Sequence, residues 1–253
     1  MERIDIDGVS LEALVAGSGR PLLFLHGIDY FAQQRPFLDR LARSFRVVAP
    51  RHPGFGGSDR PAWMRSVDDI AYLYLDLIDR LALDDAVLVG SSFGGWLALE
   101  MAVRSTARLK RLVLIDSLGL KFGGREEVEI TDLFRLSAED VVRANFVDPS
   151  HAPDYEALDP AAVEEVARDR EAAVLFGWRP FMHNPSLRHW LHRVKVPALV
   201  IWGERDGVAA PSYGAHLTQA LQRATFKPVA GAGHYPQIEQ PETVAAAIEE
   251  FAK

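Results

Sequence analysis

The stretch that decides the fold is Val89-Gly90-Ser91-Ser92-Phe93-Gly94-Gly95, which contains the pattern G-x-S-x-G with Ser92 at its centre. An apolar run precedes it, and a helical pattern of apolar residues follows it. This context is typical of a sharp strand-to-helix turn, which accepts only small residues two positions before and after the central serine. Gly90 and Gly94 meet that requirement for Ser92, whereas the neighbours of Ser91 do not. The stretch therefore predicts a serine nucleophile at a helix N-terminus, where the helix dipole favours developing negative charge.

Outward from this turn, short apolar runs alternate with helical patterns. Runs typical of buried strands lie at 22–25, 46–49, 86–89, 112–115 and 198–202, with a last strand at 225–229. Apolar residues at helical spacing or helix-start signals occur at 68–81, 93–103, 212–221 and 241–252. A hairpin-type Asp7-Gly8 joins two further strands at 3–7 and 11–16. This rhythm predicts the α/β class, with a mostly parallel sheet covered by helices on both faces.

One interval, between the predicted strands at 112–115 and 198–202, breaks this rhythm. A crossover between parallel strands needs only about a dozen residues plus loops, and this interval is several times longer. It contains three predicted helix starts, at Ser137, Asp159-Pro160 and Asn184-Pro185. We therefore expect a core domain made of residues 1–117 and 196–253, and an all-helical insertion, the cap or lid, made of residues 118–195.

The composition excludes several classes of function. Of the 253 residues, 48% are hydrophobic and 25% charged, as in ordinary globular proteins. The absence of cysteine excludes disulfides, thiolate metal ligands and a cysteine nucleophile. A net charge of −7 without a basic run argues against a nucleic-acid partner. No apolar stretch approaches the roughly 20 residues of a membrane span, and the first residues do not resemble a signal peptide. We expect a cytoplasmic protein without a membrane partner, either a monomer or a homodimer, that acts on a small molecule.

A serine hydroxyl is a poor nucleophile alone and needs a base that an acid orients. The order expected after such a turn is serine, then acid, then histidine. Asp206 follows the buried strand at 198–202, and His234 lies in a glycine-containing loop after the last strand. We therefore predict Ser92, Asp206 and His234 as the catalytic residues. Asp116, directly after an earlier strand, is the alternative acid.

The tetrahedral intermediate of acyl transfer needs hydrogen-bond donors aimed at its oxyanion. The backbone N–H groups of Phe93, after the nucleophile, and of Ile28, in the loop after the strand at 22–25, are the expected donors. This chemistry needs no metal and no cofactor, and we expect neither. The candidate pocket residues come from the loops around Ser92 and from the aromatic residues of the cap: His26, Ile28, Phe93, Phe134, Phe146, Trp178, Trp190 and Tyr235.

Together these motifs resemble the α/β-hydrolase fold superfamily, on its serine-nucleophile branch. The segments that carry the resemblance are His26-Gly27, residues 50–59, the turn around Ser92, Trp202-Gly203-Glu204-Arg205-Asp206 and Gly233-His234. They span nearly the whole chain in the order of that superfamily. The resemblance implies an eight-stranded, mostly parallel sheet with the cap inserted after strand six. One departure is Arg51, which stands where the superfamily usually has aspartate.

The resemblance leaves the reaction open, although serine at the turn argues against haloalkane dehalogenases and epoxide hydrolases, which use aspartate. The main expectation is a carboxylesterase-like hydrolase of small hydrophobic esters. The alternatives are a C–C bond hydrolase of ring meta-cleavage products, a cofactor-free perhydrolase or haloperoxidase, and a non-catalytic ligand-binding member. C–C hydrolases usually have tryptophan after the histidine, where this chain has Tyr235. They also have a cap arginine about where Trp190 lies, with Arg188 close by.

Overall fold

The computed structural model describes residues 1–124 and 126–253 and contains one eight-stranded sheet, in the order β1-β2-β4-β3-β5-β6-β7-β8. Its strands are β1 (Glu2–Ile6), β2 (Val9–Ala16), β3 (Pro21–Leu25), β4 (Arg46–Pro50), β5 (Ala86–Ser91), β6 (Leu109–Ile115), β7 (Ala198–Gly203) and β8 (Ala224–Val229). Strands β3 to β8 pair in parallel, whereas β1 and β2 join the edge beside β4 in antiparallel pairs. The predicted mostly parallel, eight-stranded α/β-hydrolase sheet is confirmed.

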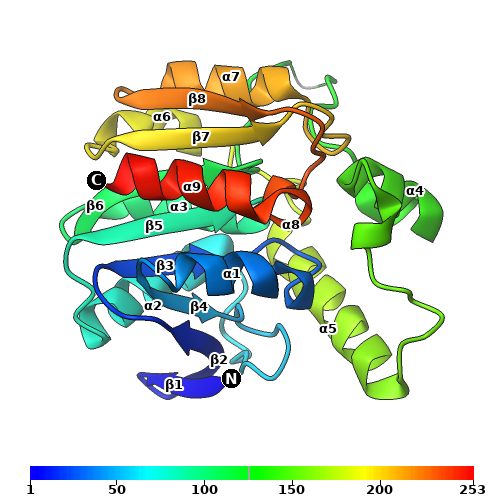
Figure 1. Ribbon diagram of the computed structural model, residues 1–253, viewed down its shortest axis with the longest axis horizontal. Helices are drawn as coiled ribbons and strands as arrows, with labels where there is room; N and C mark the ends of the chain where they lie inside the picture. The colour runs from blue at the N-terminus through cyan, green and yellow to red at the C-terminus, as the bar shows by residue number, and fades with distance from the viewer. Residues whose placement is uncertain (125) are drawn as a thin grey trace.

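Helices cover both faces of the sheet, as Figure 1 shows. The core helices are α1 (Arg35–Leu41), α2 (Val67–Arg80), α3 (Phe93–Arg104), α7 (Pro211–Ala220), α8 (Pro236–Glu239) and α9 (Pro241–Ala252), with a short η1 (Ala32–Gln34). Successive side chains of a strand point to opposite faces, so a strand with both faces covered is apolar throughout. In β3, Leu22 and Phe24 join the buried cluster of α1 and α9, while Leu23 and Leu25 join that of α2 and α3.

The cap contributes α4 (Ala138–Asn145), α5 (Pro160–Gly177) and α6 (Leu187–Trp190), with short turns η2 (Leu133–Arg135), η3 (Pro149–His151) and η4 (Leu191–Arg193). In Figure 1, α4 and α5 lie beyond the carboxyl ends of the parallel strands. The end of the cap packs elsewhere, because Leu187 and Leu191 are buried in the cluster that includes α3. Arg193 Nε also donates to the Val103 carbonyl at 2.5 Å. Helices α4 and α5 therefore extend past the strand ends, whereas the last turns of the cap pack beside α3.

A buried ionic contact ties α5 to the core. Arg51, in the loop after β4, donates to Glu165 Oε1 at 2.6 Å and to Asp169 Oδ2 at 2.5 Å, both on α5. The other oxygen of Asp169 accepts the Gly56 N–H at 2.7 Å. The arginine that departs from the superfamily pattern is thus matched by two carboxylates of the cap.

Across the described residues, no helix combines the length and the apolar character needed to cross a membrane.

Candidate active site

Ser92 lies on the turn between β5 and α3 in a conformation that few non-glycine residues adopt. Its φ is 53° and its ψ is −118°. The turn is possible because glycine flanks it: a β-carbon on Gly90 would lie 2.3 Å from the Gly94 carbonyl oxygen, and one on Gly94 would lie 2.1 Å from that of Leu25. The Ser92 N–H donates to the Ile115 carbonyl at 2.9 Å, which holds the turn against β6. The backbone therefore presents the hydroxyl at the carboxyl end of β5, where open α/β sheets place their sites.

The three predicted catalytic residues form one hydrogen-bonded relay. His234 Nε2 lies 2.8 Å from Ser92 Oγ, and His234 Nδ1 lies 2.9 Å from Asp206 Oδ2. Asp206 Oδ1 accepts the N–H groups of Val208 at 2.7 Å and Ala209 at 3.1 Å, which fixes the carboxylate. All three residues of the relay are buried. With Nδ1–H donated to the carboxylate, Nε2 is free to accept the serine proton, as nucleophilic catalysis requires.

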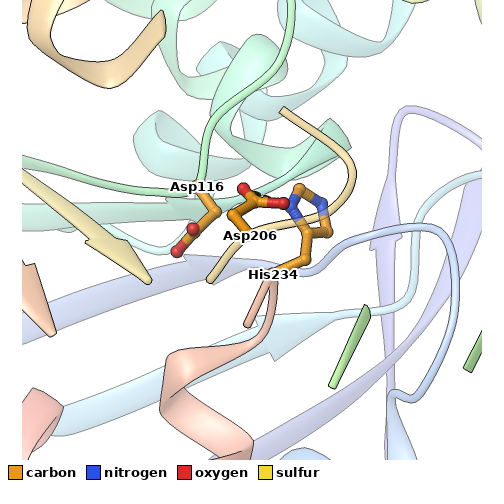
Figure 2. A group of neighbouring side chains, drawn as sticks. All are labelled: Asp116, Asp206 and His234. Carbon is orange, nitrogen blue, oxygen red and sulfur yellow. Dashed lines mark hydrogen bonds and ion pairs between the residues drawn. The ribbon is translucent and has the colours of Figure 1, made fainter. Parts of the chain in front are cut away.

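The alternative acid, Asp116, lies beside Asp206 and not against the histidine. Figure 2 shows Asp206 between Asp116 and His234, with its carboxylate turned toward the imidazole. Asp116 Oδ1 accepts the Gly203 N–H at 2.9 Å instead. Complete burial and the neighbouring Asp206 charge raise the pKa of Asp116 well above its ordinary value. These three side chains have ligand-type atoms within 4.8 Å of one another, but the relay uses those of Asp206 and His234, and we assign no metal to them.

The loops that carry Asp206 and His234 are held by the end of α4. The His234 N–H donates to the Asn145 carbonyl at 2.8 Å, and the Gly207 N–H donates to that of Ala144 at 3.1 Å. Glu239 adds a second tie, since its carboxylate accepts the N–H groups of Gly233 at 2.6 Å and Val147 at 2.9 Å. No local sequence motif predicts these contacts, because they form only when the cap docks on the core.

The two predicted oxyanion donors lie close to Ser92 along the chain or in the cavity wall. Among the described residues, the Ile28 and Phe93 amides donate to no other backbone carbonyl. Ile28 lines the same cavity as Ser92, and Phe93 is the first residue of α3. Two free N–H groups beside the serine are what a tetrahedral adduct requires for its oxygen.

A cavity of about 190 Å³ lies over Ser92 between the core loops and the cap. Its lining is mostly apolar and comes largely from the cap, including Leu118, Ile130, Leu133, Phe134, Leu136, Val141, Phe181 and Met182. Ile28, Phe134 and Tyr235, three of the candidate pocket residues, belong to this lining. The polar part consists of Asp29, Ser92, Thr131, Arg170 and Tyr235.

The other candidate pocket residues lie elsewhere. His26 is buried and stacks on His52, with ring centroids 3.8 Å apart, and its Nε2 accepts the His52 N–H at 3.1 Å. Burial lowers the pKa of His26 well below its ordinary value and that of His52 to about 3, so this pair is neutral and shapes the loop. The Phe93 ring is fully buried beside Phe55 and Trp96.

The remaining three cap aromatics also lie outside this lining. Phe146 packs behind the cavity on Tyr30 and Tyr235. Trp178 is 42% and Trp190 51% exposed. An aromatic residue in a helical cap therefore does not indicate a pocket wall unless the helix phase is known.

The sequence reasoning missed Arg170 and Asp29, two charged residues in the cavity wall. Arg170 Nε, from α5, donates to Asp29 Oδ1, in the loop after β3, at 3.0 Å. Arg188, which lies near the position of the cap arginine of C–C hydrolases, is outside the lining, and its only described hydrogen bond is to the Lys121 carbonyl at 3.5 Å. Arg170 is one of several arginines in the cap, and nothing in the local sequence distinguishes it.

Comparison with known proteins agrees with this fold. The sequence model of the alpha/beta hydrolase family matches residues 22–247, and the chain belongs to this family. It is 30% identical to 2-hydroxymuconate semialdehyde hydrolase of Pseudomonas sp. strain CF600, over 93% of this chain and 88% of the relative. It is 27% identical to 2-hydroxy-6-oxo-2,4-heptadienoate hydrolase of Pseudomonas putida F1, over 96% and 93%.

Solved structures give the same result. A variant of the meta-cleavage product hydrolase CumD, an enzyme of Pseudomonas fluorescens IP01, superposes with a TM-score of 0.80 and 26% identity, over 99% of this chain and 97% of that one. An esterase of Thermogutta terrifontis has a TM-score of 0.78 at 23% identity, over 99% and 98%, and so shares the fold. The relatives are therefore closer to the C–C hydrolase alternative than to the carboxylesterase expectation.

Proposed function

We propose that this protein is a serine hydrolase that cleaves a C–C bond in 2-hydroxy-6-oxo-dienoic acids, the products of meta ring cleavage. The carboxylesterase expectation becomes the second candidate. The curated relatives named for such substrates support the proposal. The observation that carries it is the Arg170 guanidinium in the wall of an otherwise largely apolar cavity that contains Ser92.

A cation in this position suits an anionic substrate. A dienoic acid has a carboxylate at one end and the scissile ketone several bonds away, whereas a simple ester has no charge to match. Arg170 uses only Nε in its described hydrogen bond to Asp29, so the two terminal nitrogens of the guanidinium remain for a substrate carboxylate. A hydrogen bond to a charged group contributes about 1.5–3 kcal/mol. The apolar remainder of the wall suits the carbon chain.

The relay supplies the chemistry. Ser92 Oγ bonds to the ketone carbon, its proton moves to His234 Nε2, and the carbonyl electron pair moves to the oxygen facing the Ile28 and Phe93 amides. The adduct collapses by breaking the C–C bond. In the keto tautomer of the substrate, this electron pair passes along the carbon chain to the oxygen of the C2 carbonyl, and the resulting dienolate takes the proton from His234. Water, deprotonated by His234, then hydrolyses the acyl group from Ser92.

The test compares two cap arginines on two substrates. Arg170→Met should raise KM for a 2-hydroxy-6-oxo-dienoate about 10- to 100-fold, the equivalent of one charged hydrogen bond, and leave p-nitrophenyl butyrate hydrolysis nearly unchanged. Arg188→Met is the matched control and should leave both unchanged. If the wild type hydrolyses only the ester, or if Arg170→Met weakens both substrates equally, the C–C hydrolase proposal is contradicted.

A further inference from the structure

The side chain of Tyr235, the residue after His234, reaches back over Ser92. Tyr235 is only 2% exposed, yet it lines the cavity. A β-carbon built on Gly27 would lie 2.7 Å from the Tyr235 hydroxyl oxygen and 3.1 Å from the Ser92 β-carbon. The phenol oxygen and the Ser92 side chain therefore both lie against Gly27, the residue before Ile28.

The ring of Tyr235 is held in place by its neighbours. Its centroid lies 5.2 Å from that of Tyr30 and 5.9 Å from that of Phe146. The imidazole of His234 packs edge-on at 5.1 Å. A hydroxyl on an immobilised ring needs no reorganisation when charge develops beside it, which is the condition for effective transition-state stabilisation.

The hydroxyl of Tyr235 also keeps its proton. Burial, and then the nearby Asp29 carboxylate, raise the pKa of Tyr235 well above its ordinary value. Hydrogen bonding of the phenol oxygen with the Asp29 amide and with the Ser92 side chain lowers the pKa of Tyr235, but burial outweighs both effects. The phenol therefore remains a hydrogen-bond donor throughout the pH range in which the relay works.

We propose that the Tyr235 hydroxyl is a third hydrogen-bond donor to the oxyanion of the tetrahedral adduct on Ser92, beside the Ile28 and Phe93 amides. The inference rests on the proposed acyl-enzyme chemistry. When the Oγ–C bond forms, the carbonyl electron pair moves to oxygen and the serine proton moves to His234. Tyr235 keeps its own proton and donates a hydrogen bond to that oxygen, so it consumes no co-reactant. Tyr235 is a catalytic residue in this scheme because it touches the reacting oxygen.

Tyr235→Phe is the decisive variant, because it removes one oxygen and keeps the ring contacts. Loss of one oxyanion donor costs about 10²–10³ in kcat in other enzymes. With two amides remaining, we expect kcat to fall about 10- to 100-fold with KM unchanged. The affinity for phenylboronic acid, which forms a charged tetrahedral adduct on serine, should fall by a similar factor. The affinity for benzoate, which forms no adduct, should not change.

Tyr30→Phe is the matched control, because Tyr30 packs on the same ring but is outside the cavity lining. It should leave kcat and phenylboronic acid binding unchanged. Equal boronate affinity in the wild type and Tyr235→Phe would overturn the inference, as would equal losses in the two tyrosine variants. Turnover is measured with p-nitrophenyl butyrate as well as the dienoate, so failure of the dienoate alone contradicts only the substrate proposal. Turnover retained by Ser92→Ala would contradict both.

Discussion

The two walls of the cavity over Ser92 are built on different principles. The core wall consists of loops at the carboxyl ends of strands, and backbone hydrogen bonds and strand pairing fix their positions. The cap wall consists of apolar side chains such as Phe134 and Phe181, and of Arg170, positioned by how α5 and its neighbours pack.

The difference separates reaction type from substrate choice. The core wall contains the relay and the two amides proposed as oxyanion donors, and both depend on backbone geometry that the fold imposes. The cap wall depends on side chains that can change without altering the sheet. Sites on a conserved architecture vary their substrates in this way because fold and function are separable. Changes in the core wall should therefore affect kcat, and changes in the cap wall should affect KM and substrate preference.

The largest effect is expected from Ser92→Ala in the core wall. Removing the nucleophile should lower kcat by about four to six orders of magnitude for every substrate, since the other relay residues then have nothing to activate. Measurement on the dienoate and on p-nitrophenyl butyrate tests this directly. If the two substrates lost activity to very different extents, the core wall would not be the shared chemical part of the site.

A second large effect should distinguish the two neighbouring carboxylates. Asp206→Asn removes the acceptor of the His234 Nδ1–H and should lower kcat about 10⁴-fold. Asp116→Asn keeps an acceptor for the Gly203 N–H and leaves the contact of Asp206 with His234 in place, so it should cost less than about tenfold. The comparison is made at fixed pH with the melting temperature of each variant. A larger loss in Asp116→Asn would identify Asp116 as the acid of the relay.

The same division explains what could be predicted from the sequence. The strands and the turn at Ser92 were predicted because short apolar runs and close-approach glycines are local signals, and the relay because its residues follow the expected order of serine, acid and histidine. The helices α1 and α8 were not predicted, since 7 and 4 residues are too few for a helical period to be recognised. In the cap, Phe134 and Trp190 are equally plausible wall residues in the sequence. Only the packing of η2 and α6 places Phe134 in the wall and leaves Trp190 half exposed.

The different positions of Phe134, in the cavity wall, and Trp190, outside it, predict a moderate effect on substrate binding. Phe134→Ala removes apolar surface from the cavity wall and should raise KM about 5- to 10-fold, the equivalent of roughly 1 kcal/mol of apolar contact, with kcat little changed. Trp190→Ala, outside the cavity lining, should change KM less than about twofold. A loss of kcat in Phe134→Ala would instead mean that the cap wall helps to position the relay.

The smallest effect concerns the contact that joins the two walls, the buried pair of Arg51 and Asp169, whose side chains are 7% and 11% exposed. Burial outweighs the attraction of Arg51 and raises the pKa of Asp169 to about 6. Between the ordinary pKa of an aspartate, about 4, and this value, the folded chain holds a proton that the unfolded chain has released. The free energy of unfolding contributed by Asp169 is therefore highest at acidic pH and falls as pH rises through this window.

Asp169→Asn isolates this contribution, because the amide keeps an acceptor for the Gly56 N–H and cannot ionise. The melting temperature of the wild type minus that of Asp169→Asn should fall by a few degrees from about pH 4 to about pH 7, at about 2–4 °C per kcal/mol. Glu164→Gln, on the exposed side of the same helix with a side chain 74% exposed, is the matched control measured over the same pH range. If the difference for Asp169→Asn rose with pH instead, attraction to Arg51 would exceed the cost of burying the charge. The ion pair itself, and not the packing around it, would then hold the cap wall to the core wall.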